Sequence, residues 1–253
     1  YVINAFRNSD LNFLEFDDIL NLKSKKGIEI MIILISILKY AEILNDANAI
    51  ESVKKYWQQV HDTQIRNTGN ATLDEVWTKN GNAAAMLDKE KKPNETCVAV
   101  GWIELSMYLF KLTGEAKYLD AVDKTLYNHI LASISEDGSD FAYYQANYGK
   151  KITTTDDGMY KCCRYRGFTL FTYMEDMLFY EDEEYIVPLL YTNAVFKSEH
   201  IRISEKSEYP YGGRITFVVH TDRIESKKWK LRIPKDCLPA GLTVNGSPVR
   251  PVI

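Results

Sequence analysis

"ILNDANAIESVKKYW", residues 43–57, can be laid over "LTGEAKYLDAVDKTL", residues 112–126, so that Ile50, Val53 and Trp57 match Leu119, Val122 and Leu126. In both copies the apolar spacing predicts a helix, a tight turn and a second helix. Apolar residues recur at this helical period through 28–44, 48–65, 97–112, 116–134 and 163–180. Repeated αα-hairpins stack into solenoids or close into toroids, so we expect the first two-thirds of the chain to be helical.

The pattern changes at about residue 184 to alternating β-branched and aromatic residues. The segments are "YIVPLLYTNAVF", "HIRIS", "RITFVVH", "KWKLRIP" and "LTVNG", and turn-forming stretches such as "YPYGG" and "PAG" separate them. Such segments predict short strands, and "VNG" is typical of a hairpin tip. We therefore expect a helical domain over 1–183 and the start of an antiparallel β-sandwich over 184–253.

Composition indicates an ordinary globular protein and excludes two partner classes. The 253 residues carry a formal net charge of −4, from 31 basic and 35 acidic residues that are interspersed along the chain. No basic patch for nucleic acid or an anionic membrane results. The apolar run "GIEIMIILISIL" at 27–38 contains Glu29 and is too short to span a bilayer, so it predicts a buried helix.

The ends of the sequence suggest a partial chain. The first residue is Tyr1 rather than Met, and the last segment stops at "PVRPVI". We therefore expect segments to be missing at both ends, and the sequence leaves the cellular compartment open.

Four cysteines, Cys97, Cys162, Cys163 and Cys237, are too few for a disulfide scaffold. A free cysteine is usually a small buried hydrophobe, which is the interpretation we keep for Cys237. The adjacent pair in "KCCRY" differs, because consecutive side chains on a helix or strand diverge. At a turn both thiols could face one metal ion.

The stretch "NETCVAVGW" supplies further metal-binding groups. If Asn94 caps the helix that follows, Glu95 and Cys97 lie in its first turn, where carboxylate and thiolate are both favoured. Together with Cys162 and Cys163 they form a ligand set that suits tetrahedral zinc. Upstream lies 67–94, a long Asn-, Gly- and Lys-rich loop of the kind that is usually functional. The four histidines share no metal-like spacing, and we expect His129 to be a hydrogen-bonded helix residue.

These motifs resemble one known family. "NETCVAVGW", the "LTGEAKYLD" hairpin, "YNHIL", the "KCC" pair and "RGFTLF" occur in the order found in the β-L-arabinofuranosidase family of glycoside hydrolases, family 127, formerly DUF1680. The resemblance implies an (α/α)6-barrel-type toroid, of which this chain would hold the C-terminal half, followed by a partial β-sandwich. It also implies a carbohydrate substrate, an L-arabinofuranoside or a related plant glycan.

The resemblance also implies a site. Glu95, Cys97, Cys162 and Cys163 would hold zinc, and Cys162 would attack the anomeric carbon in a double displacement with net retention. The acid/base would be Glu75 in "DEVWT", which departs from the family's G-E-x-F-T in Asp74 and Trp77. Tyr143 matches an aromatic residue near the sugar, although Phe141 and Tyr144 compete for that role and all three could serve strand packing.

Two alternatives stay open from the sequence. The chain could be a non-catalytic, truncated family member with a structural zinc site or a carbohydrate-binding role. The thiols could instead be buried and free of metal. An incomplete toroid would leave apolar helix faces exposed, which a homodimer would cover.

Overall fold

A computed structural model describes residues 18–21, 26–78, 92–147, 149–155, 161–222, 227–235 and 237–250. The chain divides into two compact units, Tyr1–Tyr173 and Met174–Ile253. The sequence pattern puts the change of domain after residue 183, and that assignment stays a prediction. Among the described helices, none combines the length and the apolar character needed to cross a membrane.

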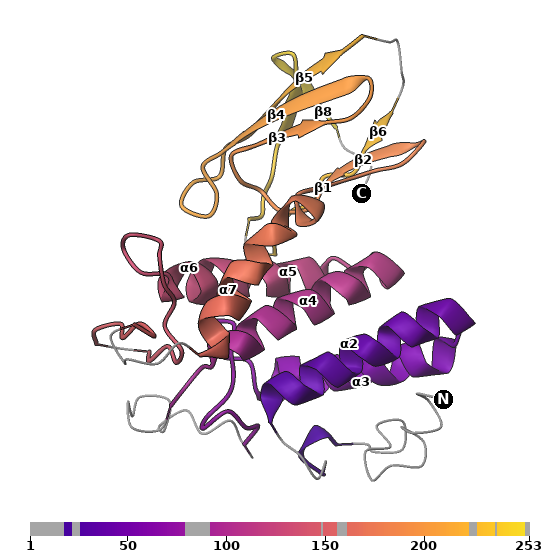
Figure 1. Cartoon of the computed structure of the whole chain (residues 1–253). Helices are drawn as coiled ribbons and strands as arrows, with labels where there is room; N and C mark the ends of the chain where they lie inside the picture. The colour runs from indigo at the N-terminus through magenta and orange to yellow at the C-terminus, as the bar shows by residue number, and fades with distance from the viewer. Residues whose placement is uncertain are drawn as a thin grey trace. The chain divides into compact units, whose positions relative to one another are not determined.

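The first unit is helical (Figure 1). Its elements are η1 (Ile19–Asn21), α2 (Gly27–Leu44), α3 (Ala47–Thr63), α4 (Thr96–Thr113), α5 (Lys117–Thr125), the π-helical turn η5 (Leu126–Ile130), α6 (Leu131–Ser133) and α7 (Cys162–Thr172). The predicted repeat is confirmed, because α2–α3 and α4–α5 are both helical hairpins. Asn45 and Gly114, which the two aligned stretches pair, end the first helix of each hairpin with φ 53° and 70°. Both residue types tolerate this left-handed conformation.

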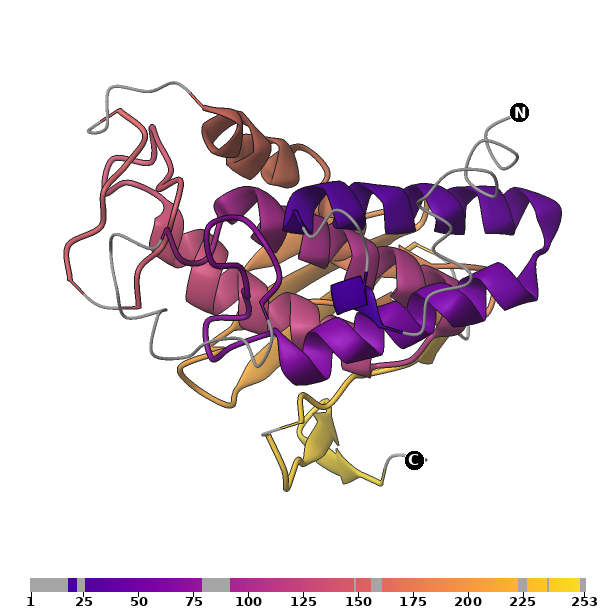
Figure 2. The ribbon, with the colours of Figure 1, turned by 90° about the horizontal axis from the view of Figure 1, so that it is seen from below.

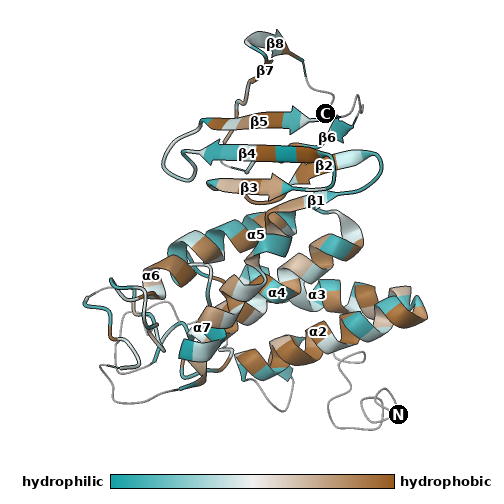
Figure 3. Ribbon diagram, turned by 45° about the horizontal axis from the view of Figure 1, so that its top comes forward, coloured by the Kyte–Doolittle hydropathy of each residue, from teal (hydrophilic) through white to brown (hydrophobic). Residues whose placement is uncertain are grey.

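A shared apolar core holds the two hairpins together. α2 and α3 lie side by side, and α4 packs against α2 (Figures 1 and 2). The indole of Trp57 on α3 stacks on Trp102 of α4 at 4.9 Å and meets the ring of Tyr118 edge-on at 4.6 Å. Its Nε1 donates to Ser106 Oγ at 2.9 Å, so the buried polar atom is satisfied. Much of α2 is hydrophobic (Figure 3), which agrees with the buried helix expected at 27–38.

Two predicted helices have different ends. The helix expected at 116–134 is interrupted by η5, where one turn widens to the π-helical form. The helix expected at 163–180 ends at Thr172 and is followed by the 3-10 helix η6 (Met174–Met177). The remainder, Phe179–Glu181, forms strand β1, because its aromatic residues pair with a neighbouring strand instead of continuing the helix.

After η6, the regular elements among the described residues of the second unit are all strands. They are β1 (Phe179–Glu181), β2 (Tyr185–Pro188), β3 (Ala194–Lys197), β4 (Ile201–Ser207), β5 (Ile215–Thr221), β6 (Lys228–Trp229), β7 (Leu242–Val244) and β8 (Ser247–Val249). The sheets have the orders β1-β2-β6, β3-β4-β5 and β7-β8. A small core of Phe179, Ile186, Ile201 and Ile203 joins the first two sheets. The expectation of purely antiparallel pairing was wrong at one place, since β2 and β6 run parallel.

Turn chemistry sets the register of this unit. Asn245 and Gly246 connect β7 to β8 with φ 50° and 80°, as the "VNG" motif predicts. The "YPYGG" stretch lies between β4 and β5, which pair from Ile201↔Thr221 to Ser207↔Ile215. The change from helices to strands along the chain is therefore as expected.

Candidate active site

The candidate site lies where the first residues of α4 and α7 meet. α4 begins at Thr96, and Glu95 rather than Asn94 is its N-cap residue, without a side-chain cap bond. Asn94 takes a positive φ of 55°, and its side-chain amide donates to Gln145 O and to Asn147 Oδ1, both at 2.9 Å. The expected capping by Asn94 was therefore wrong, although Cys97 does lie in the first helical turn.

The predicted metal ligands come together. One ligand atom from each of Glu95, Cys97, Cys162 and Cys163 lies within 4.8 Å of all the others. The Cys163 thiol is 3.1 Å from Cys97 Sγ and 3.8 Å from Glu95 Oε1. Residues 66 positions apart in the chain thus converge, because α7 packs on α4.

Two contacts fix α7 in this position. Arg166 of α7 and Tyr173, its C-cap residue, both bond to Glu104 of α4. On its buried side, Gly167 lies so close to the ring of Phe141 that an added Cβ would be 2.8 Å from it. The helix start is therefore held from two directions.

The adjacent cysteines are the first two residues of α7 and do not form a turn. Cys163 is fully buried, whereas Cys162 is exposed. Consecutive helical side chains diverge, and here the divergence leaves one thiol inside the cluster and the other at its surface. The two cysteines thus suit different tasks.

Burial dominates the electrostatics of the cluster. Together with the smaller effect of the charges on Glu75 and Cys162, it raises the pKa of Glu95 to about 8. It also raises the pKa of the Cys163 thiol. The pKa of Cys162, in contrast, is lowered to about 5. The hydrogen bond with Cys163 is the largest cause of this decrease, and burial opposes it. A buried group of this kind cannot hold several negative charges without a cation.

The donor set fits a metal ion. Glu95 is 1% exposed, and its Oε2 has no hydrogen-bond partner among the described residues. Buried carboxylate oxygens are normally satisfied, so an unpartnered one beside three thiols indicates a ligand position. These four residues could therefore hold a metal ion.

Glu75 lies on a tight turn beside this cluster. Asp74 and Glu75 have φ 49° and 68°, a conformation that residues other than glycine adopt at a cost. The turn is held by the Leu73↔Val76 bridge and by Gly27 N, which donates to Glu75 O at 2.8 Å. Of the predicted loop 67–94, residues 79–91 lie outside the described part, and the flanks pair through Leu73 and Pro93.

Three side chains hold the Glu75 carboxylate. Tyr143 and Tyr144 donate to Oε1, with a distance of 3.1 Å for Tyr143, and Lys26 Nζ is 3.0 Å from Oε2. Burial on its own raises the pKa of Glu75, but the bonds from Tyr144 and Lys26 outweigh it and the pKa is lowered. At neutral pH the carboxyl is therefore ionised.

Tyr143 connects Glu75 to the cluster. Its hydroxyl lies 3.5 Å from Cys162 Sγ, and its ring is 4.4 Å from that of Tyr144. Phe141, the other candidate aromatic, is fully buried and packs against Phe168 of α7. The structure thus brings Tyr143 and Tyr144 to the candidate site and places Phe141 in the core.

Sequence reasoning missed Lys26. It precedes α2 and is 49 positions from Glu75. Nothing in "KSKKGIEIM" distinguishes this lysine from its neighbours, so only the fold reveals the ion pair. Cys237, the remaining cysteine, is half-buried in the second unit and outside the cluster.

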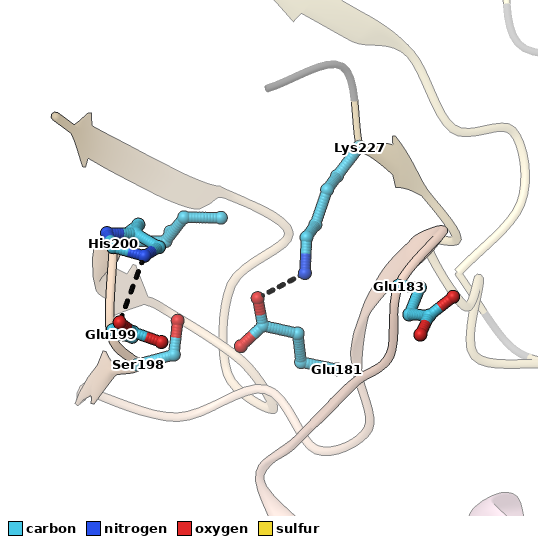
Figure 4. Close-up of a pocket in the computed structure, with 7 residues that line it drawn as sticks. Glu181, Glu183, Ser198, Glu199, His200 and Lys227 are labelled. Carbon is cyan, nitrogen blue, oxygen red and sulfur yellow. Dashed lines mark hydrogen bonds and ion pairs between the residues drawn. The ribbon is translucent and has the colours of Figure 1, made fainter. Parts of the chain in front are cut away.

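The second unit contains a polar cavity of about 490 Å³ (Figure 4). Lys227 pairs with Glu181 at 2.6 Å, and His200 with Glu199 at 3.3 Å. The lining combines three glutamates with one lysine and one histidine, and none of the predicted site residues is among them.

Comparison with known proteins identifies the family. Residues 17–176 match the family described as "Beta-L-arabinofuranosidase, GH127 catalytic domain", and 186–252 match the corresponding GH127 middle domain. A non-reducing end β-L-arabinofuranosidase from Bifidobacterium longum subsp. longum is 23% identical, over 81% of this chain and 34% of the relative. This chain therefore spans about a third of the length of that relative.

Solved structures agree on the fold. A GH127 β-L-arabinofuranosidase from Geobacillus stearothermophilus T6 aligns with TM-score 0.72 and 17% identity, over 88% of this chain and 38% of that one. A GH127 β-arabinofuranosidase aligns with TM-score 0.76 and 22% identity, over 95% and 40% of the two chains. The chain therefore belongs to the GH127 β-L-arabinofuranosidase family, with a catalytic-domain region at 17–176 and a middle-domain region at 186–252.

Proposed function

We propose that the protein is a retaining glycoside hydrolase that acts on L-arabinofuranosides or related plant glycans, with Cys162 as nucleophile and Glu75 as acid/base. One observation carries the proposal. The exposed thiol of Cys162 and the carboxylate of Glu75 both contact the Tyr143 hydroxyl, at 3.5 and 3.1 Å. A nucleophile and a proton-transfer group on one open surface are what a double displacement requires.

The same proposal assigns a metal to the cluster. Glu95, Cys97, Cys162 and Cys163 would hold zinc, for which thiolate-rich sites are typical. When bound, zinc supplies positive charge that keeps the thiols deprotonated at neutral pH. The unpartnered Glu95 Oε2 and the close thiols support this assignment.

The chain's own residues divide the reaction between them. Cys162 Sγ attacks the anomeric carbon, and its C–S bond forms as the bond to the leaving oxygen breaks. Protonated Glu75 gives its proton to that oxygen. In the second half, Glu75 removes a proton from water, the water oxygen attacks the anomeric carbon, and the C–S bond breaks to regenerate Cys162. Two inversions give net retention.

The hydrogen bonds around Glu75 favour the second half in the substrate-free protein. Tyr143, Tyr144 and Lys26 all stabilise its ionised form, which is the form that activates water. For the first half Glu75 must take up a proton, so the approach of the sugar has to weaken one of these contacts. Tyr143 is the side chain placed to change partner, because Cys162 is its other neighbour.

We also infer that the two hairpins belong to an (α/α)6-type toroid and that the sheets belong to a β-sandwich. The structural alignments support this, since 88–95% of the chain superposes on proteins more than twice as long. A homodimer that covers exposed apolar helix faces, such as Ile32 at 50% exposure, stays a prediction.

Turnover of an aryl L-arabinofuranoside tests the proposal, measured on metal-free protein before and after one equivalent of zinc. Zinc-dependent turnover with a retained product, followed by NMR, is the expected result. The Cys162→Ala variant serves as the matched control and is expected to lack turnover. Stoichiometric zinc binding without turnover would instead support the non-catalytic alternative, in which the metal only stabilises the fold.

A further inference from the structure

A fully buried histidine lies directly behind the candidate metal ligands. His129 is 0% exposed and belongs to the π-helical turn η5. A single π-turn inside an α-helical segment adds a residue to the turn and is frequent at functional sites. Here it separates α5 from α6 and carries the imidazole toward the start of α4.

The imidazole contacts the residue between two proposed ligands. His129 Nε2 is 3.2 Å from Thr96 Oγ1, and Thr96 separates Glu95 from Cys97. Thr96 Oγ1 donates its one hydrogen to Ala142 O at 2.8 Å. The hydroxyl can therefore only accept from the imidazole, so His129 carries its hydrogen on Nε2. Burial lowers the pKa of His129 to about 3, which agrees with a neutral ring.

This contact fixes more than one side chain. Thr96 N donates to Tyr143 O at 3.0 Å, and Glu95 forms an isolated bridge with Tyr144. Thr96 is thus held by its backbone on one side and by the His129–Thr96–Ala142 hydrogen bonds on the other. Glu95 and Cys97, as its direct neighbours, cannot turn independently of it.

We propose that His129 is a positioning residue of the metal site, which holds Thr96 so that Glu95 and Cys97 present their ligand atoms in a fixed arrangement. The inference rests on the proposed metal site and adds a residue that touches neither metal nor substrate. Groups that orient ligands from behind typically change metal affinity on the order of 10–100-fold when removed. The histidine's role is therefore measurable without any turnover.

The test compares zinc affinity among variants by competition with a chromophoric chelator, together with the melting temperature of the metal-free proteins. His129→Leu keeps bulk and removes the donor, and we expect zinc affinity to fall about 10–100-fold. His129→Gln restores a donor and should recover most of that loss. Ser133→Ala is the matched control, because it removes a 2.8 Å bond to the His129 carbonyl in the same segment and leaves the ring in place.

A second pair of variants tests the His129–Thr96 contact by changing Thr96. Thr96→Val removes the accepting hydroxyl and should weaken zinc binding as His129→Leu does, whereas Thr96→Ser should not. The double variant of Thr96→Val and His129→Leu should lose little more than either single one, since both remove one interaction. This pair also decides the question if His129→Leu does not fold.

The outcomes separate two failures. Unchanged zinc affinity in His129→Leu, or an equal loss in Ser133→Ala, overturns the positioning role while the metal site stands. No stoichiometric zinc in the unmodified protein overturns the metal site itself, and this inference with it.

Discussion

Cys162 and Glu75 contact the same hydroxyl group, since Tyr143 Oη lies 3.5 Å from the sulfur and 3.1 Å from the carboxylate. That hydroxyl has one hydrogen to donate, so it can satisfy the thiolate or the carboxylate at one time. The protonation states of the proposed nucleophile and acid/base are therefore linked through a single side chain.

Tyr143→Phe removes this link, and we expect turnover to fall on the order of 10–100-fold. Tyr144→Phe is the matched comparison, because Tyr144 also bonds to Glu75 but, within the described part of the chain, forms no hydrogen bond with a thiol. Initial rates on an aryl arabinofuranoside measure both. An equal loss in the two variants would show that only the Glu75 contact matters.

Exposure predicts the order in which the thiols react. Cys162 is exposed, whereas Cys97 is 3% and Cys163 0% exposed. In the metal-free protein, iodoacetamide should alkylate Cys162 well before the two buried thiols, and mass spectrometry of a time course locates the label. Half-buried Cys237 provides an internal reference. Alkylation of Cys163 first would contradict the described geometry.

Residue type and period allowed the four candidate ligands and both hairpins to be predicted, and the structure shows why other features were not predicted. Helical spacing is visible in the sequence, so the ends of α2 and α4 were predicted within one residue. The interruption at η5 has no such pattern, because Leu126 and Ile130 keep an apolar period through it. Long-range polar contacts such as Lys26–Glu75 depend on packing alone.

Lys26→Met tests how Glu75 is held ionised. The substitution removes a bond and a charge that lower the pKa of Glu75, so that pKa should rise. A general acid works while protonated, and the decline of kcat/KM with increasing pH should therefore move to higher pH. Lys111→Met, which removes a 2.9 Å pair with Glu42 instead, should leave the profile unchanged. A profile that moves to lower pH would contradict the assignment.

Glu205 gives the second unit a pH-dependent stability. It is 3% exposed, accepts from Thr192 N at 3.0 Å, and burial raises its pKa to about 7. Because the pKa is higher in the folded state, Glu205 stabilises the fold in its protonated form. This contribution to the free energy of unfolding is fully present below the ordinary pKa of 4.5 and is lost as pH rises through about 7. Glu205→Gln should remove this dependence, on the order of 1–3 kcal/mol between the two pH values. Urea unfolding monitored at both pH values measures it.

Gly167 determines how closely α7 approaches the rest of the site. A Cβ at this position would lie 2.8 Å from three atoms of the Phe141 ring, which is itself fully buried and held edge-on to Phe168 at 5.0 Å. Because this ring is fully buried, Gly167→Ala should displace the helix start and cost about 1–3 kcal/mol of stability. Cys162 and Cys163 are the first residues of the same helix, so zinc affinity should fall together with stability. Combining Gly167→Ala with Phe141→Leu should relieve the overlap and recover part of the lost stability and zinc affinity. Gly114→Ala is the control, because an added Cβ at Gly114 would have nothing within 4 Å. It should lower stability through the positive φ of that residue and leave zinc affinity unchanged.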